Sequence, residues 1–167
     1  GLIPLSVFRN LIYFALLLGE LDWVKTFLET HPPERICGTR YPDEIHRLNL
    51  ADYHFNLKQY EAAQSILIYR HFENPTVGIL ADILLIKIFF ETQNTVLESR
   101  MKALDQKIRR SKLSPTIKNR YGNFLKKLDK IVKYGWQAKS PKRARLVEEI
   151  KTTSEIVARE WLLEKLA

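Results

Sequence analysis

Residues 49–67 read NLADYHFNLKQYEAAQSIL, and alanine stands at positions 51, 62 and 63, where a helix buried in a core more often has leucine. Apolar residues recur at helical spacing on both sides of the turn-like residues 56–58, which predicts two helices joined by a tight turn. Two helices that cross at close range need a small side chain on each facing surface, with larger side chains beside it. We therefore expect Ala51 and Ala63 to be the close-contact positions of a helix hairpin.

The spacing around these alanines is that of a known helical repeat. The tetratricopeptide repeat (TPR) has an Ala followed four residues later by Phe on its second helix, and a closing Pro. Here Ala63 is followed by Leu67, and Pro75 closes the unit. On the first helix, Ala51 and His54 stand where the family has Gly and Tyr. The stretch resembles one TPR unit, whose repeat positions are Leu50, Ala51, His54, Tyr60, Ala63, Leu67 and Pro75.

Neighbouring segments show the pattern more weakly. Leu11, Ala15 and Leu28 hold comparable places about 39 residues earlier, and Leu84 and Leu97 keep the register in a third segment. Together the segments are similar to the C-terminal part of long TPR-like proteins of Bacteroidota. The resemblance implies an all-α fold, with antiparallel helix hairpins stacked as a TPR-like right-handed α-solenoid. It also implies a protein-binding scaffold, and it supplies no catalytic residues.

Turn and capping signals divide the chain into helices. Serine followed by proline at 114–115 and 140–141 places a hydroxyl at the N-cap and a proline at the first helical position. We expect one α-helical repeat domain over 1–167, with hairpins at about 4–31, 42–71 and 76–110, a basic helix at 115–134 and capping helices at 141–166. The individual helices are expected near 4–18, 20–31, 42–56, 58–71, 76–92, 94–110, 115–134, 141–152 and 155–166. Because the chain starts at Gly1 rather than Met, we expect it to be a fragment of a longer one.

The net charge of +8 is unevenly distributed. Residues 1–95 contain eight Lys/Arg and eleven Asp/Glu, whereas residues 96–167 contain nineteen and eight. The helix expected at 115–134 has an apolar stripe on one side and lysines on the other, so the simplest interpretation is an amphipathic helix with a solvated basic face. The alternative is a surface that binds an acidic partner, a nucleic acid or another polyphosphate, or an anionic membrane. The candidate partner-binding residues are Lys118, Lys126, Lys127, Lys130, Lys133, Trp136 and Arg143.

Several classes of function lack the residues they need. The chain has no nucleophile signature, no glycine-rich phosphate loop and no recognition motif for nucleic acid, so we expect it not to be an enzyme and to hold no cofactor. His46 and His54 are eight residues apart on one expected helix, too far to share a metal. A single cysteine, Cys37, indicates a reducing compartment and hence the cytoplasm. No apolar run is long enough for a transmembrane segment.

The leading hypothesis is a non-enzymatic protein–protein interaction scaffold that binds a protein or peptide ligand. The alternative is a nucleic-acid or anion-binding module that uses the basic segment 100–145. The sequence leaves the oligomeric state open.

Overall fold

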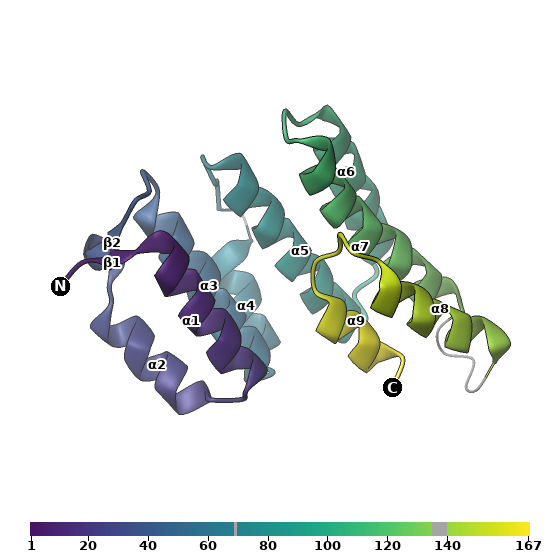
Figure 1. Ribbon diagram of the computed structural model, residues 1–167, viewed down its shortest axis with the longest axis horizontal. Helices are drawn as coiled ribbons and strands as arrows, with labels where there is room; N and C mark the ends of the chain where they lie inside the picture. The colour runs from purple at the N-terminus through teal and green to yellow at the C-terminus, as the bar shows by residue number, and fades with distance from the viewer. Residues whose placement is uncertain (69, 135–139) are drawn as a thin grey trace. The chain divides into compact units, whose positions relative to one another are not determined.

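The computed structural model describes residues 1–68, 70–134 and 140–167. Within these ranges the fold is all-α, as the periodicity predicts, and the two strands have only two residues each. The helices are α1 (Leu5–Leu17), α2 (Leu21–Thr30), α3 (Pro42–Asn56), α4 (Tyr60–Leu67), α5 (Pro75–Glu91), α6 (Leu97–Arg110), α7 (Pro115–Tyr134), α8 (Pro141–Thr152) and α9 (Arg159–Lys165), shown in Figure 1.

Proline sets the start of the helices whose bounds were predicted most accurately. The predicted ranges 42–56, 115–134 and 141–152 agree with α3, α7 and α8 to the residue, and each of these helices begins at a proline. Its fixed φ and missing N–H suit the first helical position and no interior one. The side chains of Ser114 and Ser140 accept hydrogen bonds from the amides of Ile117 (3.3 Å) and Arg143 (3.2 Å), as expected of N-caps.

The chain divides into two compact units, unit 1 (Gly1–Glu98) and unit 2 (Ser99–Ala167). Unit 1 contains α1 to α5, and unit 2 contains α7, α8, α9 and nearly all of α6. The boundary falls inside the segment 76–110, for which one hairpin was expected. The single repeat domain over 1–167 stays a prediction, as does the stacked solenoid.

In unit 1, α3 is the central helix and contacts α1, α2, α4 and α5. Its contact with α4 is the most extensive between any two helices in the part of the chain that the structure describes. Ala51 on α3 and Ala63 on α4 are both fully buried, whereas Ala62 is half-buried. Ala51 and Ala63 therefore belong to the core of unit 1, and their facing contact in a helix hairpin stays a prediction.

Two polar side chains of α3 form hydrogen bonds with the helices beside it, one with the segment before α5 and one with α2. The buried carboxylate of Glu44 accepts hydrogen bonds from the amides of Glu73 (2.6 Å) and Asn74 (3.1 Å), just before α5 begins. A carboxylate is stabilised there because the first amides of a helix carry partial positive charge. On the other side, His46 Nε2 lies 3.1 Å from the carbonyl oxygen of Leu28 in α2.

The helices α1, α3 and α5 end in the same way. Each is followed by a residue with positive φ, namely Gly19 (76°), Lys58 (59°) or Gln93 (52°). In all three, that residue's amide donates to the carbonyl three residues back, and the next amide donates to the carbonyl five residues back, at 2.9 to 3.2 Å. This is the Schellman motif. It recurs at intervals of 39 and 35 residues, which matches the spacing of the sequence pattern.

Short irregular elements fill the segment between α2 and α3. A 3-10 turn, η1 (Pro33–Arg35), leads into β2 (Ile36–Cys37), which pairs in parallel with β1 (Ile3–Pro4). The periodicity does not predict this pairing, because two residues are too few to show an alternating pattern. Several helices are shorter than predicted: α4 ends at Leu67, α6 begins at Leu97, and α9 begins only after Ala158, whose φ is 55°.

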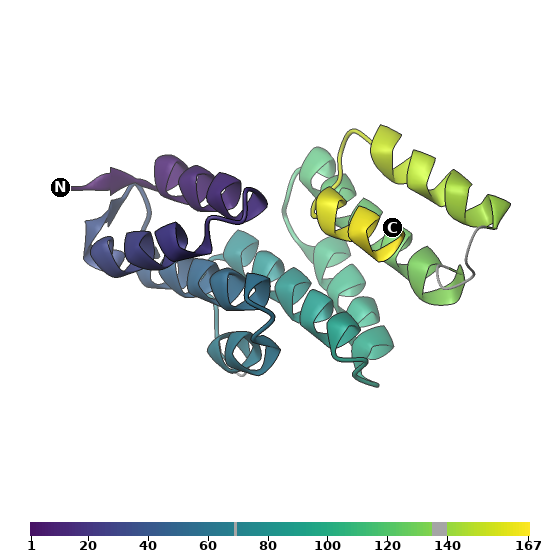
Figure 2. The ribbon, with the colours of Figure 1, turned by 90° about the horizontal axis from the view of Figure 1, so that it is seen from below.

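In unit 2, α7, α8 and α9 each contact the other two, and Figure 2 shows them as one cluster. Phe124 of α7 is fully buried, and its ring lies 6.2 Å from the ring of the buried Trp161 of α9. The side-chain amide of Asn123 donates to the backbone carbonyl of Glu155 at 2.8 Å and connects α7 to the segment before α9. None of the helices in the described ranges combines the length and apolar composition needed to cross a bilayer.

Candidate functional site

The predicted repeat positions have packing and capping roles. Leu67 is buried, the Tyr60 ring lies 5.4 Å from that of Phe55, and Pro75 is the first residue of α5. His54 Nδ1 lies 2.6 Å from the side-chain oxygen of Gln59, across the turn between α3 and α4. Ala51 and Ala63 are fully buried in α3 and α4, and Leu50 is half-buried in α3.

The outer face of α1 is apolar and exposed in the part of the chain that the structure describes. Val7, Leu11, Phe14 and Leu18 are spaced four, three and four residues apart, so they lie on one side of the helix. The four residues are 44%, 41%, 58% and 78% exposed, respectively. The buried face of the same helix is formed by other residues, namely Phe8, Ile12 and Ala15. We call Val7, Leu11, Phe14 and Leu18 the α1 stripe.

The α1 stripe was not anticipated from the sequence, although a signal for it is present. A helix that covers a core on one side needs apolar residues on only about a third of its surface. Between Leu5 and Leu17 the single charged residue is Arg9, and apolar residues occur on every side. Such a helix is either buried all round or has a second apolar face for a partner.

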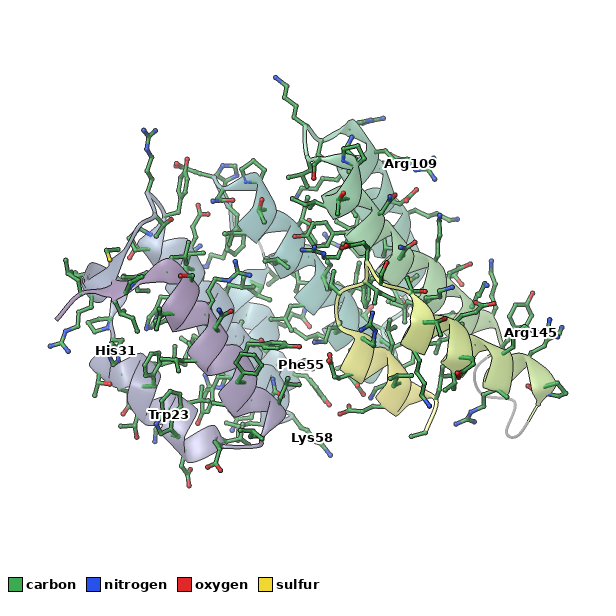
Figure 3. The ribbon with its side chains drawn as sticks, viewed as in Figure 1. Trp23, His31, Phe55, Lys58, Arg109 and Arg145 are labelled. Carbon is green, nitrogen blue, oxygen red and sulfur yellow. The ribbon has the colours of Figure 1, made fainter. Side chains whose placement is uncertain are left out.

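Aromatic rings stack along α2 in the same unit. Trp23 stacks on Phe27 with ring centres 4.8 Å apart, and Phe27 stacks on His31 at 4.2 Å. Trp23 is 43% exposed, and Figure 3 shows it and His31 along α2. Phe27 is buried, so the outer rings extend from a fixed core residue.

Most lysines of the predicted basic face are bonded within unit 2. Lys127 and Lys130 both place Nζ 3.0 Å from Glu149 Oε2, Lys133 pairs with Asp129 at 2.8 Å, and Lys118 donates to the carbonyl of Arg109 at 3.1 Å. Among the five candidate lysines, only Lys126 has no hydrogen bond or ion pair with any described residue. The sequence predicts the positive charges of this face correctly, but its pattern does not show how many are compensated by carboxylates of distant segments.

The hydrogen bonds to Glu149 affect its ionisation. Those from Lys130 and Lys127 lower the pKa of this carboxyl below its ordinary value of 4.5, against the opposing effect of burial. Glu149 is therefore fully ionised at neutral pH, and it fixes the position of both ammonium groups.

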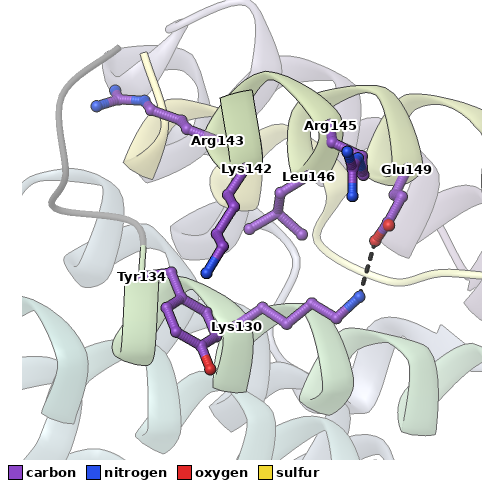
Figure 4. Close-up of a pocket in the computed structure, with 7 residues that line it drawn as sticks. All are labelled: Lys130, Tyr134, Lys142, Arg143, Arg145, Leu146 and Glu149. Carbon is purple, nitrogen blue, oxygen red and sulfur yellow. Dashed lines mark hydrogen bonds and ion pairs between the residues drawn. The ribbon is translucent and has the colours of Figure 1, made fainter. Parts of the chain in front are cut away.

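A cleft of about 250 Å³ lies between α7 and α8. We call it the α7–α8 cleft. Figure 4 shows Lys130 extending across it from α7 and Lys142 extending into it from α8, where Nζ lies 5.0 Å from the centre of the Tyr134 ring. The cleft is lined by Lys130, Tyr134, Lys142, Arg143, Arg145, Leu146 and Glu149.

The two predicted partner-binding residues that are not lysines are Arg143 and Trp136. Arg143 borders the α7–α8 cleft, but its guanidinium points away from it in Figure 4 and donates to the carbonyl of Leu166 and, at 2.9 Å, to that of Ala167. Arg143 thus anchors the end of α9. Trp136 lies outside the residues that the structure describes.

One carboxyl in unit 1 has a pKa shifted in the opposite direction to that of Glu149. Burial raises the pKa of Asp52 above its ordinary value of 3.8, and the charge of Lys87 opposes this only in part. A desolvated carboxyl with one cation nearby is also a feature of active sites.

The described residues contain no cluster of three or more His, Cys, Asp or Glu side chains that could hold a metal ion.

Comparisons of the chain with protein-family models, curated proteins and solved structures gave no match. Membership of the TPR-like family therefore stays a prediction from the residues.

Proposed function

We propose that the protein is a non-enzymatic interaction scaffold of TPR-like type, which binds an apolar helical segment of a partner protein on the α1 stripe. The observation that supports this most is the exposure of Val7, Leu11, Phe14 and Leu18 along one side of α1. The proposal includes the right-handed stack of antiparallel hairpins. The Schellman ends of α1, α3 and α5, at intervals close to a TPR length, support such a stack in unit 1.

The chemistry of the stripe defines the partner. Exposed apolar side chains in one continuous row favour the burial of a matching apolar surface. A spacing of four, three and four residues suits the apolar side of another helix, which binds through residues at the same intervals. Because α1 has only one charge, Arg9, the contact face of the partner must be apolar as well.

The cytoplasm is the proposed location, since Cys37 is the only cysteine of the sequence and a reducing compartment keeps a single thiol free.

A photo-crosslinking amino acid at position 11 tests the proposal in cells. The matched control has the same amino acid at position 9, which is exposed on the opposite side of α1. We expect a defined crosslinked protein from position 11 only.

After reconstitution with that protein, Leu11→Glu should weaken binding at least tenfold, because a buried charge replaces an apolar anchor. Arg9→Gln, which changes the net charge equally, should have little effect. Identical crosslinks from both positions would contradict the proposal.

A further inference from the structure

The α7–α8 cleft brings together cations that no carboxylate neutralises. Lys142 places Nζ over the ring of Tyr134, and neither Lys142 nor Arg145 has a hydrogen bond or ion pair with any described residue. Lys130 adds a third positive charge, which is held at the cleft by Glu149. We propose that the α7–α8 cleft is a binding site for a phosphate group, with Lys142, Arg145 and Lys130 as its ligands. This role is independent of the α1 stripe.

The number of cations favours phosphate over a singly charged anion. Since the Arg143 guanidinium is directed away from the cleft, the described lining offers three cations, Lys130, Lys142 and Arg145, and one carboxylate, Glu149. A carboxylate ligand would leave this excess only partly neutralised, whereas a phosphate carries up to two charges and offers several acceptor oxygens. Arg145 can donate two hydrogen bonds at once to such a group, and Lys142 can approach it as a point charge.

The size of the cleft sets the part of the ligand that enters it. Sites for whole drug-sized ligands have volumes of about 300 to 1,000 Å³. The α7–α8 cleft, at about 250 Å³, is smaller and suits a phosphate group with the atoms next to it. The remainder of the ligand would extend into solvent beside α7 and α8.

The first turn of α8 contains an electrostatic conflict that a phosphate would relieve. Lys142 and Arg143 lie there, and no acidic residue does. Cations are unfavourable at this end of a helix, because the free amides already carry partial positive charge. Conflicts between local preference and sequence are typical of functional positions. An anion beside Lys142 would interact favourably with the side chain and with the end of the helix together.

Tripolyphosphate is the probe for the first experiment, measured by calorimetry on the whole chain at low ionic strength. Lys142→Ala and Arg145→Ala should each weaken binding about tenfold or more, since each removes a charged hydrogen-bond donor. Lys151→Ala is the matched control, because Lys151 is an exposed lysine of the same helix outside the cleft. It removes the same charge and should change the affinity less than about twofold.

Glu149→Gln distinguishes a specific site from a nonspecific basic surface by how much the affinity for tripolyphosphate changes. The substitution removes the one carboxylate among the described lining residues and leaves the charge of Lys130 uncompensated, so tripolyphosphate should bind several-fold more tightly. Glu148→Gln, on the adjacent exposed residue, changes the net charge equally and is the control. Arg145→Lys should retain much of the affinity that Arg145→Ala loses.

A labelled single-stranded oligonucleotide distinguishes the two sources of phosphate. If Lys142→Ala weakens both probes, the site accepts the backbone phosphate of a nucleic acid. If only tripolyphosphate binds in the cleft, the ligand is a free oligophosphate. Either result supports the site. Equal losses in Lys142→Ala and Lys151→Ala, or no binding of tripolyphosphate by the unmodified chain, would overturn it.

Discussion

Units 1 and 2 use their charged residues in opposite ways. Unit 1 has eight Lys/Arg and twelve Asp/Glu, a formal charge of −4, whereas unit 2 has nineteen and seven, a formal charge of +12. In unit 1, where carboxylates outnumber basic side chains, Glu44 accepts hydrogen bonds from the backbone amides before α5. In unit 2, where carboxylates are scarce, Glu149 serves two lysines at once.

The difference shows which surface of each unit is available to bind a partner or ligand. In unit 1, carboxylates are plentiful and the α1 stripe is exposed in the described part of the chain, so the partner proposed for this unit is apolar. In unit 2, Phe124 of α7 and Trp161 of α9 pack together, and Lys142 and Arg145 have no ion pair with any described residue. The two units therefore offer surfaces of different chemistry on one chain, and each can be changed without the other.

The largest expected effect tests whether the units unfold separately. Phe8 in unit 1 and Phe124 in unit 2 are both fully buried. Each phenylalanine replaced by alanine should lower the free energy of unfolding of its own unit by about 3 to 5 kcal/mol, through lost burial and the cavity left behind. Native-state hydrogen exchange should show faster exchange on one side of residue 98 only. Exchange that rises on both sides would show that the chain unfolds as the single domain that the sequence suggests.

The next effect concerns the tight packing within unit 1. Ala63→Leu should cost about 1 to 3 kcal/mol of unfolding free energy, because the contact between α3 and α4 has no room for the added atoms. Ala62→Leu makes the same chemical change one residue earlier, at a half-buried position, and should alter stability by less than about 0.5 kcal/mol. Urea denaturation of both variants provides the measurement. Equal effects would contradict the close-contact role of Ala63.

These alanines also show what a sequence can predict. The burial of Ala51 and Ala63 could be predicted because a small residue among large ones at helical spacing has a local cause, the close packing of helices. The starts of α3, α7 and α8 are predictable for the same reason, since proline acts on its own helix. The partners of Lys127 and Lys130 are not, because Glu149 follows them by 22 and 19 residues. Such pairs depend on tertiary packing that no local pattern encodes.

The exposed α1 stripe was missed for a different reason. The periodicity of Leu11 and Ala15 indicates a core-facing helix, and in the structure only Ala15 is buried. An apolar residue that faces the core and one that faces a partner look alike in a sequence. Only the surrounding helices show which of the two faces is covered.

A smaller effect is expected at the helix ends of unit 1. Gly19 has no neighbouring atom where a Cβ would be placed, so Gly19→Ala should cost only the strain of a left-handed residue, about 1 kcal/mol. Lys58→Gly relieves the same strain at the end of α3 and should stabilise unit 1 by a few tenths of a kcal/mol, after the entropy cost of glycine. Thermal unfolding should show opposite shifts for the two variants, with unit 2 unchanged. Shifts of the same sign would contradict the equivalence of the two ends.

The last prediction concerns only the signs of two pH dependences. The pKa of Glu149 is lowered in the folded protein, so the ionised carboxylate stabilises unit 2 above pH 4.5, and this contribution is lost as the pH falls through the lowered pKa. The pKa of Asp52 is raised, so its contribution to unit 1 is greatest below pH 3.8 and is lost as the pH rises through the raised pKa.

The two amide variants should therefore shift stability in opposite directions. At neutral pH, Glu149→Gln should destabilise unit 2, because Lys127 and Lys130 lose an ionised acceptor, and Asp52→Asn should stabilise unit 1, because the neutral amide avoids the cost of burying a charge. Both differences from the unmodified chain should shrink as the pH falls toward 4, where the carboxyls begin to bind protons. Melting temperatures of both variants and the unmodified chain, measured across this pH range, test the predicted signs. If Asp52→Asn destabilises at neutral pH, the attraction of Lys87 exceeds the cost of burial, and unit 1, like unit 2, would use its carboxylate to hold a cation.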